Sequence, residues 1–122
     1  KHQMDLGEQI KRIRTAKGLS QKEVIMEAGL DKAQYSRIEN GKTDPSFTTV
    51  SKIAKALGVS LAELFSDSAL EDVNSYDKGL MERVAMIDQL PEDERKTLFT
   101  ILDAFIGKKK LKDTLSNVLQ DV

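Results

Sequence analysis

The chain has 122 residues, of which 32% are charged and 5% aromatic, and it contains neither Trp nor Cys. The scarcity of aromatic residues predicts an aliphatic core, which favours an all-α fold over a β-sandwich. The absence of Cys excludes a disulfide framework and a thiolate metal site. No apolar run approaches the roughly 18 residues that span a bilayer, and no signal-peptide core precedes the first helix. We therefore expect a cytoplasmic protein with no membrane contact.

The two halves of the chain differ in charge. Residues 1–66 carry 11 Lys or Arg against 8 Asp or Glu, whereas residues 67–122 carry 8 against 12. The net charge of the whole chain is −1, but the first half is net positive and the second half net negative. A basic first half suits a polyanionic partner, and the acidic second half indicates a different task.

Five short helices are predicted in residues 1–66 from apolar spacing, caps and breakers. Ser20 and Glu23 have the spacing of a capping box, and so do Ser60 and Glu63. The predicted helices cover residues 4–17, 21–28, 31–39, 45–57 and 60–65. The short connections between them indicate a compact helical domain.

The rest of the chain is expected to form a separate helical segment. Residues 67–77 are polar and weakly patterned, so we interpret them as a linker between a domain 1–66 and a segment 78–122. Pro91 suits the first position of a helix, and the acidic residues after it match the positive end of the helix dipole. The apolar stripes of the segment begin with Leu80, Val84 and Ile87 and continue with Leu98, Ile101, Leu102 and Phe105.

The stretch of residues 29–43 has few apolar residues for a structural helix. Its expected outer side carries Lys32, Gln34, Ser36 and Arg37. Together with the helix 21–28 and a tight turn at residues 29–31, the helix 31–39 has the spacing of a helix-turn-helix motif. The segments IKRIRTAKGLSQKEV and GLDKAQYSRIENGKTDPSFTTVSKIAKALGVSLAELF resemble the Cro/phage-repressor type of helix-turn-helix regulators, also called the xenobiotic-response-element family.

This resemblance covers Ile10 to about Phe65 and implies a five-helix, repressor-like DNA-binding domain. It implies that Arg14 and Glu39 form a structural ion pair between the first and third helices. Arg37 is expected to read guanine, because its guanidinium group can donate hydrogen bonds to O6 and N7 of the base together. The base-reading positions implied by the family are Lys32, Ala33, Gln34, Ser36 and Arg37. The phosphate-binding positions implied are Gln21, Lys22, Asn40, Lys42 and Thr43.

A domain of this size makes a small footprint on DNA, and tight binding generally requires two copies on half-sites about 34–36 Å apart. We therefore predict a repressor that binds a palindromic operator in double-stranded DNA as a homodimer, with residues 31–39 reading the bases. The expected dimer interface comprises Leu80, Val84, Ile87, Leu98, Ile101, Leu102 and Phe105. Two alternatives remain open for this segment, namely packing on residues 1–66 or docking a separate protein partner.

An alternative function is an antitoxin-like or adaptor module that uses the same fold to bind a protein. The polar outer side of residues 31–39 suits bases better than an apolar partner. Catalysis is not expected, because the carboxylates lie on polar helix faces and His2 is the lone His. We likewise expect no metal and no cofactor.

Overall fold

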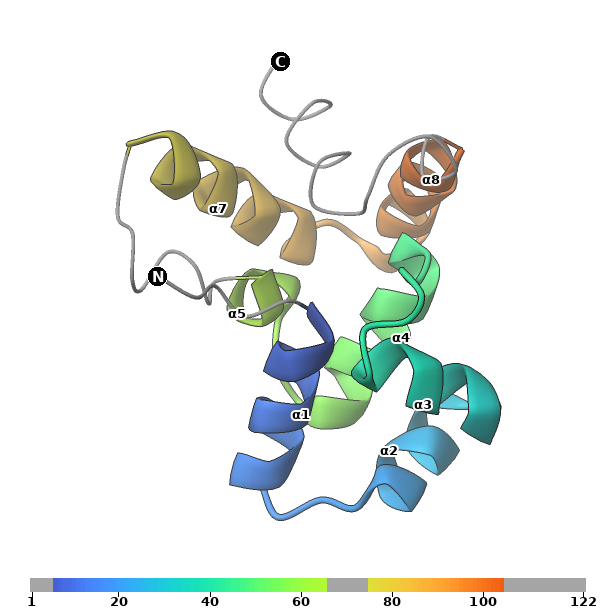
Figure 1. The fold of residues 1–122 in the computed structure, drawn as a ribbon. Coiled ribbons are helices and arrows are strands. Elements are labelled where there is room, and N and C mark those ends of the chain that lie inside the picture. Colours follow the sequence, from blue (N-terminus) through green and yellow to red (C-terminus); the bar gives the residue numbers. More distant parts are fainter. Residues whose placement is uncertain (1–5, 66–74, 105–122) are drawn as a thin grey trace.

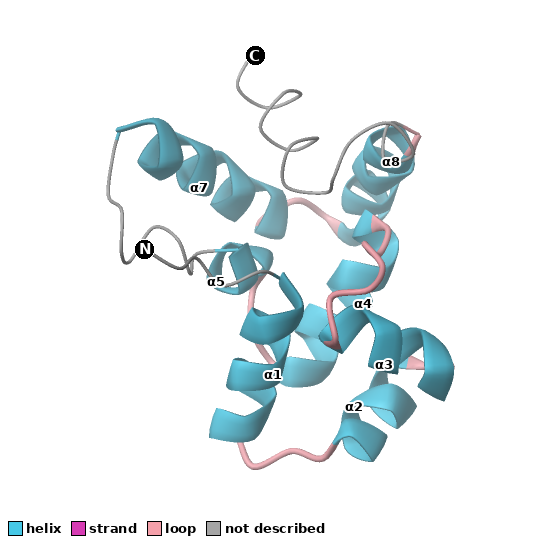
Figure 2. Ribbon diagram, viewed as in Figure 1, coloured by secondary structure: helices cyan, strands magenta, loops and turns pink. Residues whose placement is uncertain are grey.

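The computed structural model of the chain describes residues 6–65 and 75–104. Within these ranges every element is a helix (Figures 1 and 2), which confirms the all-α expectation and the five predicted helices of the first half. The helices are α1 (Leu6–Ala16), α2 (Gln21–Ala28), α3 (Lys32–Glu39), α4 (Phe47–Leu57), α5 (Leu61–Phe65), α7 (Ser75–Asp88) and α8 (Glu92–Asp103). None of the described helices is long and apolar enough to cross a membrane.

Local capping explains where the short helices begin and end. The Ser20 hydroxyl accepts the Glu23 N–H at 3.1 Å, and the Ser20 N–H donates to the Glu23 carboxylate at 2.9 Å. Ser60 and Glu63 repeat this reciprocal capping box at the start of α5. Gly29 ends α2 in the left-handed conformation, with φ of 68°, where a side chain would be strained.

The core joins the helices of the first half through aliphatic side chains. Ile10, Val50, Ile53 and Leu64 are completely or almost completely buried. Gly7 brings α1 against the end of α3, because a Cβ at this position would lie 2.5 Å from the Ile38 carbonyl oxygen. This close approach fixes α3 on the body of the domain.

The second half packs on the first, with α7 against α5 and α8 against α4. Val84 of α7 is completely buried. Phe99 of α8 is 3% exposed and stacks on Phe47 with ring centroids 6.5 Å apart. In Figure 1 these two helices lie at the top of the molecule, whereas α2 and α3 lie at the bottom.

Two aspartates reinforce this docking by capping helices of the first half. The Asp88 carboxylate accepts the N–H groups of Leu61 and Ala62 at 3.0 and 3.1 Å, at the start of α5. The Asp103 carboxylate accepts the Phe47 N–H at 2.6 Å and the Thr48 hydroxyl at 3.0 Å, at the start of α4. Each cap places a negative charge at the positive end of a helix dipole.

This packing corrects part of the predicted dimer interface. Val84, Ile87 and Leu102 are buried in the core of the chain itself, so they have almost no area left for a partner. Leu98 is half-buried against the same core, whereas Ile101 is 51% exposed. The predictions for Leu80 and Phe105 concern side chains outside the described part of the chain.

Several element boundaries also differ from expectation. Helix α4 begins at Phe47 rather than at residue 45, because Ser46 is its N-cap. Helix α7 begins at Ser75, so residues 75–77 of the predicted linker are helical. The first turn of α7 is polar, and a polar first turn cannot be distinguished from a linker by apolar spacing. Pro91 is the residue before α8 rather than its first residue. Its φ of −56° and ψ of 152° show that the backbone turns helical only at Glu92.

Candidate nucleic-acid interface

The candidate site is built on α2, the turn after it and α3. Asp31 caps α3, with its carboxylate accepting the Gln34 N–H at 3.1 Å. The Leu30 N–H reaches back to the Ile25 carbonyl at 3.1 Å, which closes the end of α2 around Gly29. These local bonds set the direction of the chain between the two helices, so the motif does not depend on long-range contacts alone.

Helix α3 has a buried side and an exposed side. Tyr35, Ile38 and Glu39 are at most 5% exposed. The five predicted base-reading residues lie outside this buried set, and three of them, Lys32, Ala33 and Arg37, are exposed, whereas Gln34 and Ser36 are half-buried. Within the described residues, the Arg37 guanidinium makes no ion pair and no side-chain hydrogen bond. The Arg37 side chain is therefore exposed to solvent.

A buried network around Glu39 holds the inner side of α3. The Arg14 guanidinium forms a bidentate ion pair with Glu39, donating from Nε to Oε2 at 2.9 Å and from Nη2 to Oε1 at 3.0 Å. The Tyr35 hydroxyl donates to Oε2 at 2.7 Å. A third Arg14 nitrogen donates to the Leu19 carbonyl at 2.8 Å, which ties the α1–α2 connection to the same point. The ion pair expected from the resemblance is thus present in the structure.

The protonation equilibria of this network follow from its geometry. Burial by itself would raise the pKa of Glu39, but hydrogen bonds from Arg14, Tyr35 and Gln21 outweigh it and hold this pKa below its usual value. The hydrogen bond to Glu39 raises the pKa of Arg14. Burial, followed by the Glu39 carboxylate, raises the pKa of the Tyr35 hydroxyl. At neutral pH the network is therefore a carboxylate held by a guanidinium and a neutral phenol.

Gln21 has a role that the sequence pattern did not predict. Its side-chain amide donates to Oε1 of Glu39 at 2.7 Å, so α2 is tied to the end of α3. The resemblance implies a phosphate contact for this residue, and the structure commits one of its two side-chain amide hydrogens to the network. A second unpredicted polar contact involves Gln9, which is 2% exposed and donates to the Glu63 carbonyl at 3.4 Å.

The remaining predicted phosphate-binding residues are all exposed. Lys22 lies in the first turn of α2, and Asn40, Lys42 and Thr43 lie in the connection between α3 and α4. Gly41 adopts φ of 74° in that connection, which turns the chain after Asn40. The structure thus places the exposed cations Lys22 and Lys42 on either side of α3 along the chain.

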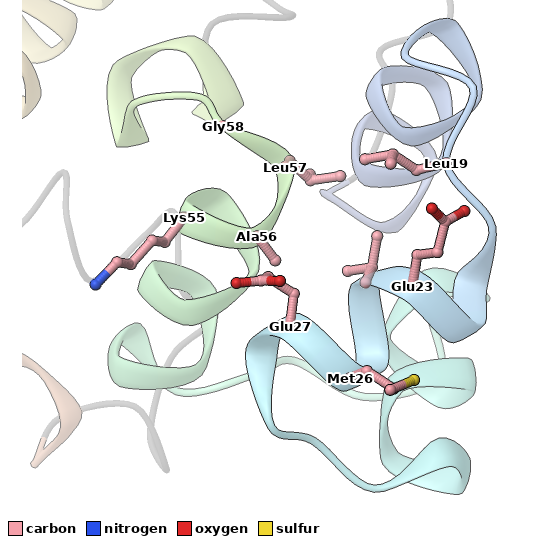
Figure 3. A pocket seen from close by; sticks show the side chains of 9 residues that line it. Leu19, Glu23, Met26, Glu27, Lys55, Ala56, Leu57 and Gly58 are labelled. Atoms are coloured by element: carbon pink, nitrogen blue, oxygen red, sulfur yellow. The ribbon is translucent and has the colours of Figure 1, made fainter.

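A pocket of about 430 Å³ lies between α2 and the end of α4. Figure 3 shows Glu23 and Glu27 on the α2 side and Leu57 and Ala56 on the α4 side. Met26, which also lines it, is 71% exposed. Among the described residues no group of three His, Cys, Asp or Glu side chains is placed to hold a metal ion.

The fold and the two-sided α3 define a helix-turn-helix protein in which one side of the second helix of the motif faces solvent. Comparison with known proteins agrees. The helix-turn-helix family model matches residues 10–64. The transcriptional repressor RstR of the cryptic phage CTXphi from Vibrio cholerae is 35% identical over 104 residues, which are 85% of this chain and 90% of that protein. The control protein C.MunI from a Mycoplasma species is 44% identical over 62 residues, covering 50% of this chain and 84% of that protein.

The crystal structure of the restriction-modification controller protein C.AhdI from Aeromonas hydrophila matches with a TM-score of 0.48 at 37% identity. The match covers 49% of this chain and 91% of that one. The chain belongs to the helix-turn-helix family of DNA-binding transcriptional regulators, of the Cro/phage-repressor type. This is a family of regulators and not of enzymes.

Proposed function

We propose that the chain is a cytoplasmic repressor that binds a palindromic operator in double-stranded DNA as a homodimer, with α3 in the major groove of each half-site. The observation that carries this proposal is the build of α3. Its inner side is fixed by the Glu39 network, while Lys32 and Arg37 on its outer side are exposed. A rigidly supported helix can hold its outer side chains in the fixed geometry that base reading requires.

The five outer residues of α3 have distinct proposed roles. Arg37 pairs with O6 and N7 of a guanine, which is the commonest specific contact in the major groove. Lys32 approaches a base acceptor near the start of the helix, and the Ala33 methyl contacts a thymine methyl. Gln34 and Ser36 are half-buried, and they contribute at the edge of the reading surface.

The flanking residues are proposed to hold the DNA backbone. Lys22 and Lys42 supply charge to phosphates, and Asn40 and Thr43 supply hydrogen bonds. The side-chain amide of Gln21 is bonded to Glu39, so Gln21 is proposed to contribute to phosphate binding through its place at the N-terminal end of α2. These contacts fix the register of α3 on the duplex without selecting a sequence.

For the dimer we propose a contact that includes Leu98 and Ile101 of α8. Ile101 is a large aliphatic side chain that is 51% exposed, and Leu98 lies one turn before it on the helix. The names of two relatives, a transcriptional repressor and a control protein, support a regulatory role at operators. The proposed contact does not include Val84, Ile87 and Leu102. These side chains are buried in the core of the chain and do not reach its surface.

An antitoxin-like or adaptor function is the second candidate. The observation in its favour is the exposed Met26 beside the pocket between α2 and α4, which a protein partner could cover. Binding through that surface would leave the outer side of α3 unused. Substitution of Arg37 therefore separates the two functions, because only the DNA-binding function depends on it.

The test compares Arg37→Ala with Lys42→Ala on a selected operator and on random duplex DNA. Arg37→Ala should weaken operator binding by about 1–3 kcal/mol and relax the preference at one base pair per half-site. Lys42→Ala should weaken binding to both duplexes and reduce the salt slope by about one. Equal losses from Arg37→Ala on both duplexes would refute its role as a base reader.

A further inference from the structure

Helix α8 carries an aliphatic side chain that packs only partly against the described part of the chain. Ile101 is 51% exposed, whereas Phe99 and Leu102 of the same helix are buried in the core. Leu98, which is half-buried, lies one turn before Ile101, and Ala104, which is exposed, lies one turn after it. These three residues, Leu98, Ile101 and Ala104, form the outer stripe of α8, and all of them are apolar.

Charges of opposite sign flank this outer stripe along the sequence. The first turn of α8, residues 92–94, is acidic and exposed. Residues 108–110, which follow the helix in the sequence, are all Lys. Ile101 is the midpoint of the two groups, since Asp93 precedes it by eight residues and Lys109 follows it by eight. The half-exposed aliphatic side chain is therefore centred between an acidic and a basic group.

Two copies of α8 that pack antiparallel would use both features. A two-fold axis at Ile101 sets the two isoleucines against each other and places Leu98 opposite the partner's Ala104, a large side chain opposite a small one. Glu94 then lies about 10 Å from the axis along the helix, and the partner's Ala104 lies about 4.5 Å from the axis in the same direction. Lys108 follows Ala104 by four residues, so their Cα atoms are at most about 14 Å apart. The Lys residues of each copy can thus reach the acidic turn of the other copy.

The charges also select the orientation of the two helices. A parallel pair would place the two acidic turns side by side, where they repel each other, whereas an antiparallel pair sets opposite charges and opposite helix dipoles together. In Figure 1, α8 lies at the opposite end of the molecule from α2 and α3. A contact through α8 therefore leaves α3 of both copies free.

We infer that the chain dimerises through antiparallel contact of the outer stripe of α8 with the outer stripe of a second copy, with residues 92–94 of each copy against residues 108–110 of the other. Helix α8 is only about 18 Å long, so the contact is small and the dimer dissociates on dilution. This inference rests on the proposed function, which requires a homodimer, and it adds the orientation, the register and the ionic contacts of that dimer.

The first test measures self-association of the full chain without DNA, by sedimentation velocity over a wide range of concentrations. The wild-type chain should show a monomer–dimer equilibrium. Ile101→Glu should weaken self-association at least about tenfold, because it places two carboxylates together at the axis. Met86→Glu is the matched control, since Met86 of α7 is 65% exposed and lies outside the outer stripe, and it should change self-association less than about twofold. Circular dichroism should show that both variants keep their helix content.

The second test reverses the charges in two different chains. One chain carries Glu94→Lys, and the other carries Lys108→Glu, Lys109→Glu and Lys110→Glu. Each chain alone should dimerise about three- to tenfold more weakly than the wild-type chain at low salt, because like charges face each other across the axis. In an equimolar mixture both ionic contacts are restored, so native mass spectrometry should find more heterodimer than either homodimer. Pairing of these charges within one chain would give no such preference.

The inference is overturned if the wild-type chain stays monomeric, if Ile101→Glu associates as tightly as the wild-type chain, or if the mixture shows no preference for the heterodimer. None of these results bears on whether α3 reads bases, which the selection of DNA sequences tests separately. Arg37→Ala, in turn, should leave self-association unchanged, so the failure of one proposal can be told from the failure of the other.

Discussion

Replacing Glu39 by Gln should destabilise the fold more than any other change of a single charge at the described site. The substitution keeps the size of the side chain but removes the negative charge to which three side chains donate hydrogen bonds. Arg14, Tyr35 and Gln21 all donate to this carboxylate, at distances between 2.7 and 3.0 Å. The amide of Gln has one acceptor oxygen, so it can accept only some of these hydrogen bonds. Its NH₂ group is itself a donor and would face the donors of the neighbouring side chains.

The magnitude follows from the burial of the pair. The Glu39 side chain is 2% exposed and the Arg14 side chain 13%. Removing one partner of a buried ion pair typically costs about 3–5 kcal/mol, because the other charge is left uncompensated. The partial exposure of Arg14 places the expected loss near the lower end, at about 3 kcal/mol. For a domain of this size that corresponds to a fall in Tm of about 12–24 °C.

The assay is equilibrium unfolding in guanidinium chloride at pH 7, followed by circular dichroism. The midpoint should fall while the m-value stays constant, and Glu27→Gln, an exposed change on α2, should stay within about 0.5 kcal/mol of the wild-type chain. A loss below about 1 kcal/mol for Glu39→Gln would show that solvent reaches the ion pair. The account of a rigidly supported α3 would then be wrong.

Three further predictions concern the same support of α3. Tyr35→Phe should cost about 1.5–2 kcal/mol in chemical unfolding, because one hydrogen bond to a charged acceptor is lost, and an unchanged midpoint would contradict this. Gly7→Ala should cost about 2 kcal/mol, since the new Cβ meets backbone oxygens that cannot rotate away, whereas a neutral result would mean that α1 is not so close to α3. The lowered pKa of Glu39 means that its stabilisation is present above the unfolded pKa of about 4.3 and is lost as the pH falls through the folded value. The stability gap between the wild-type chain and Glu39→Gln should therefore be constant from pH 7 to 5 and shrink below about pH 4, and a gap that persists in acid would refute the assignment.

Much of the first half could be predicted from sequence because its boundaries are set locally. A Ser and a Glu three residues apart make a capping box without help from the rest of the fold, and Gly29 ends α2 through its own backbone freedom. The two sides of α3 follow from helical spacing combined with the family resemblance. The ion pair between Arg14 and Glu39 was available only from that resemblance.

The helix caps that escaped prediction join residues far apart in the sequence. Asp88 and Asp103 cap helices that begin 27 and 56 residues earlier, and no local pattern marks them as caps. The apolar residues of α8 also occupy more than one side of the helix. Only the packing of α8 on α4 selects Phe99 and Leu102 for the core and leaves Ile101 exposed.

Base reading by α3 is proposed to depend on Arg37. The most direct test selects bound sequences from random duplex DNA with the full wild-type chain and with Arg37→Ala. If α3 reads bases, the wild-type chain should select a palindromic motif, and the variant should lose the preference at one position per half-site. No enriched motif at low salt from the wild-type chain, or the same motif from both chains, would contradict it.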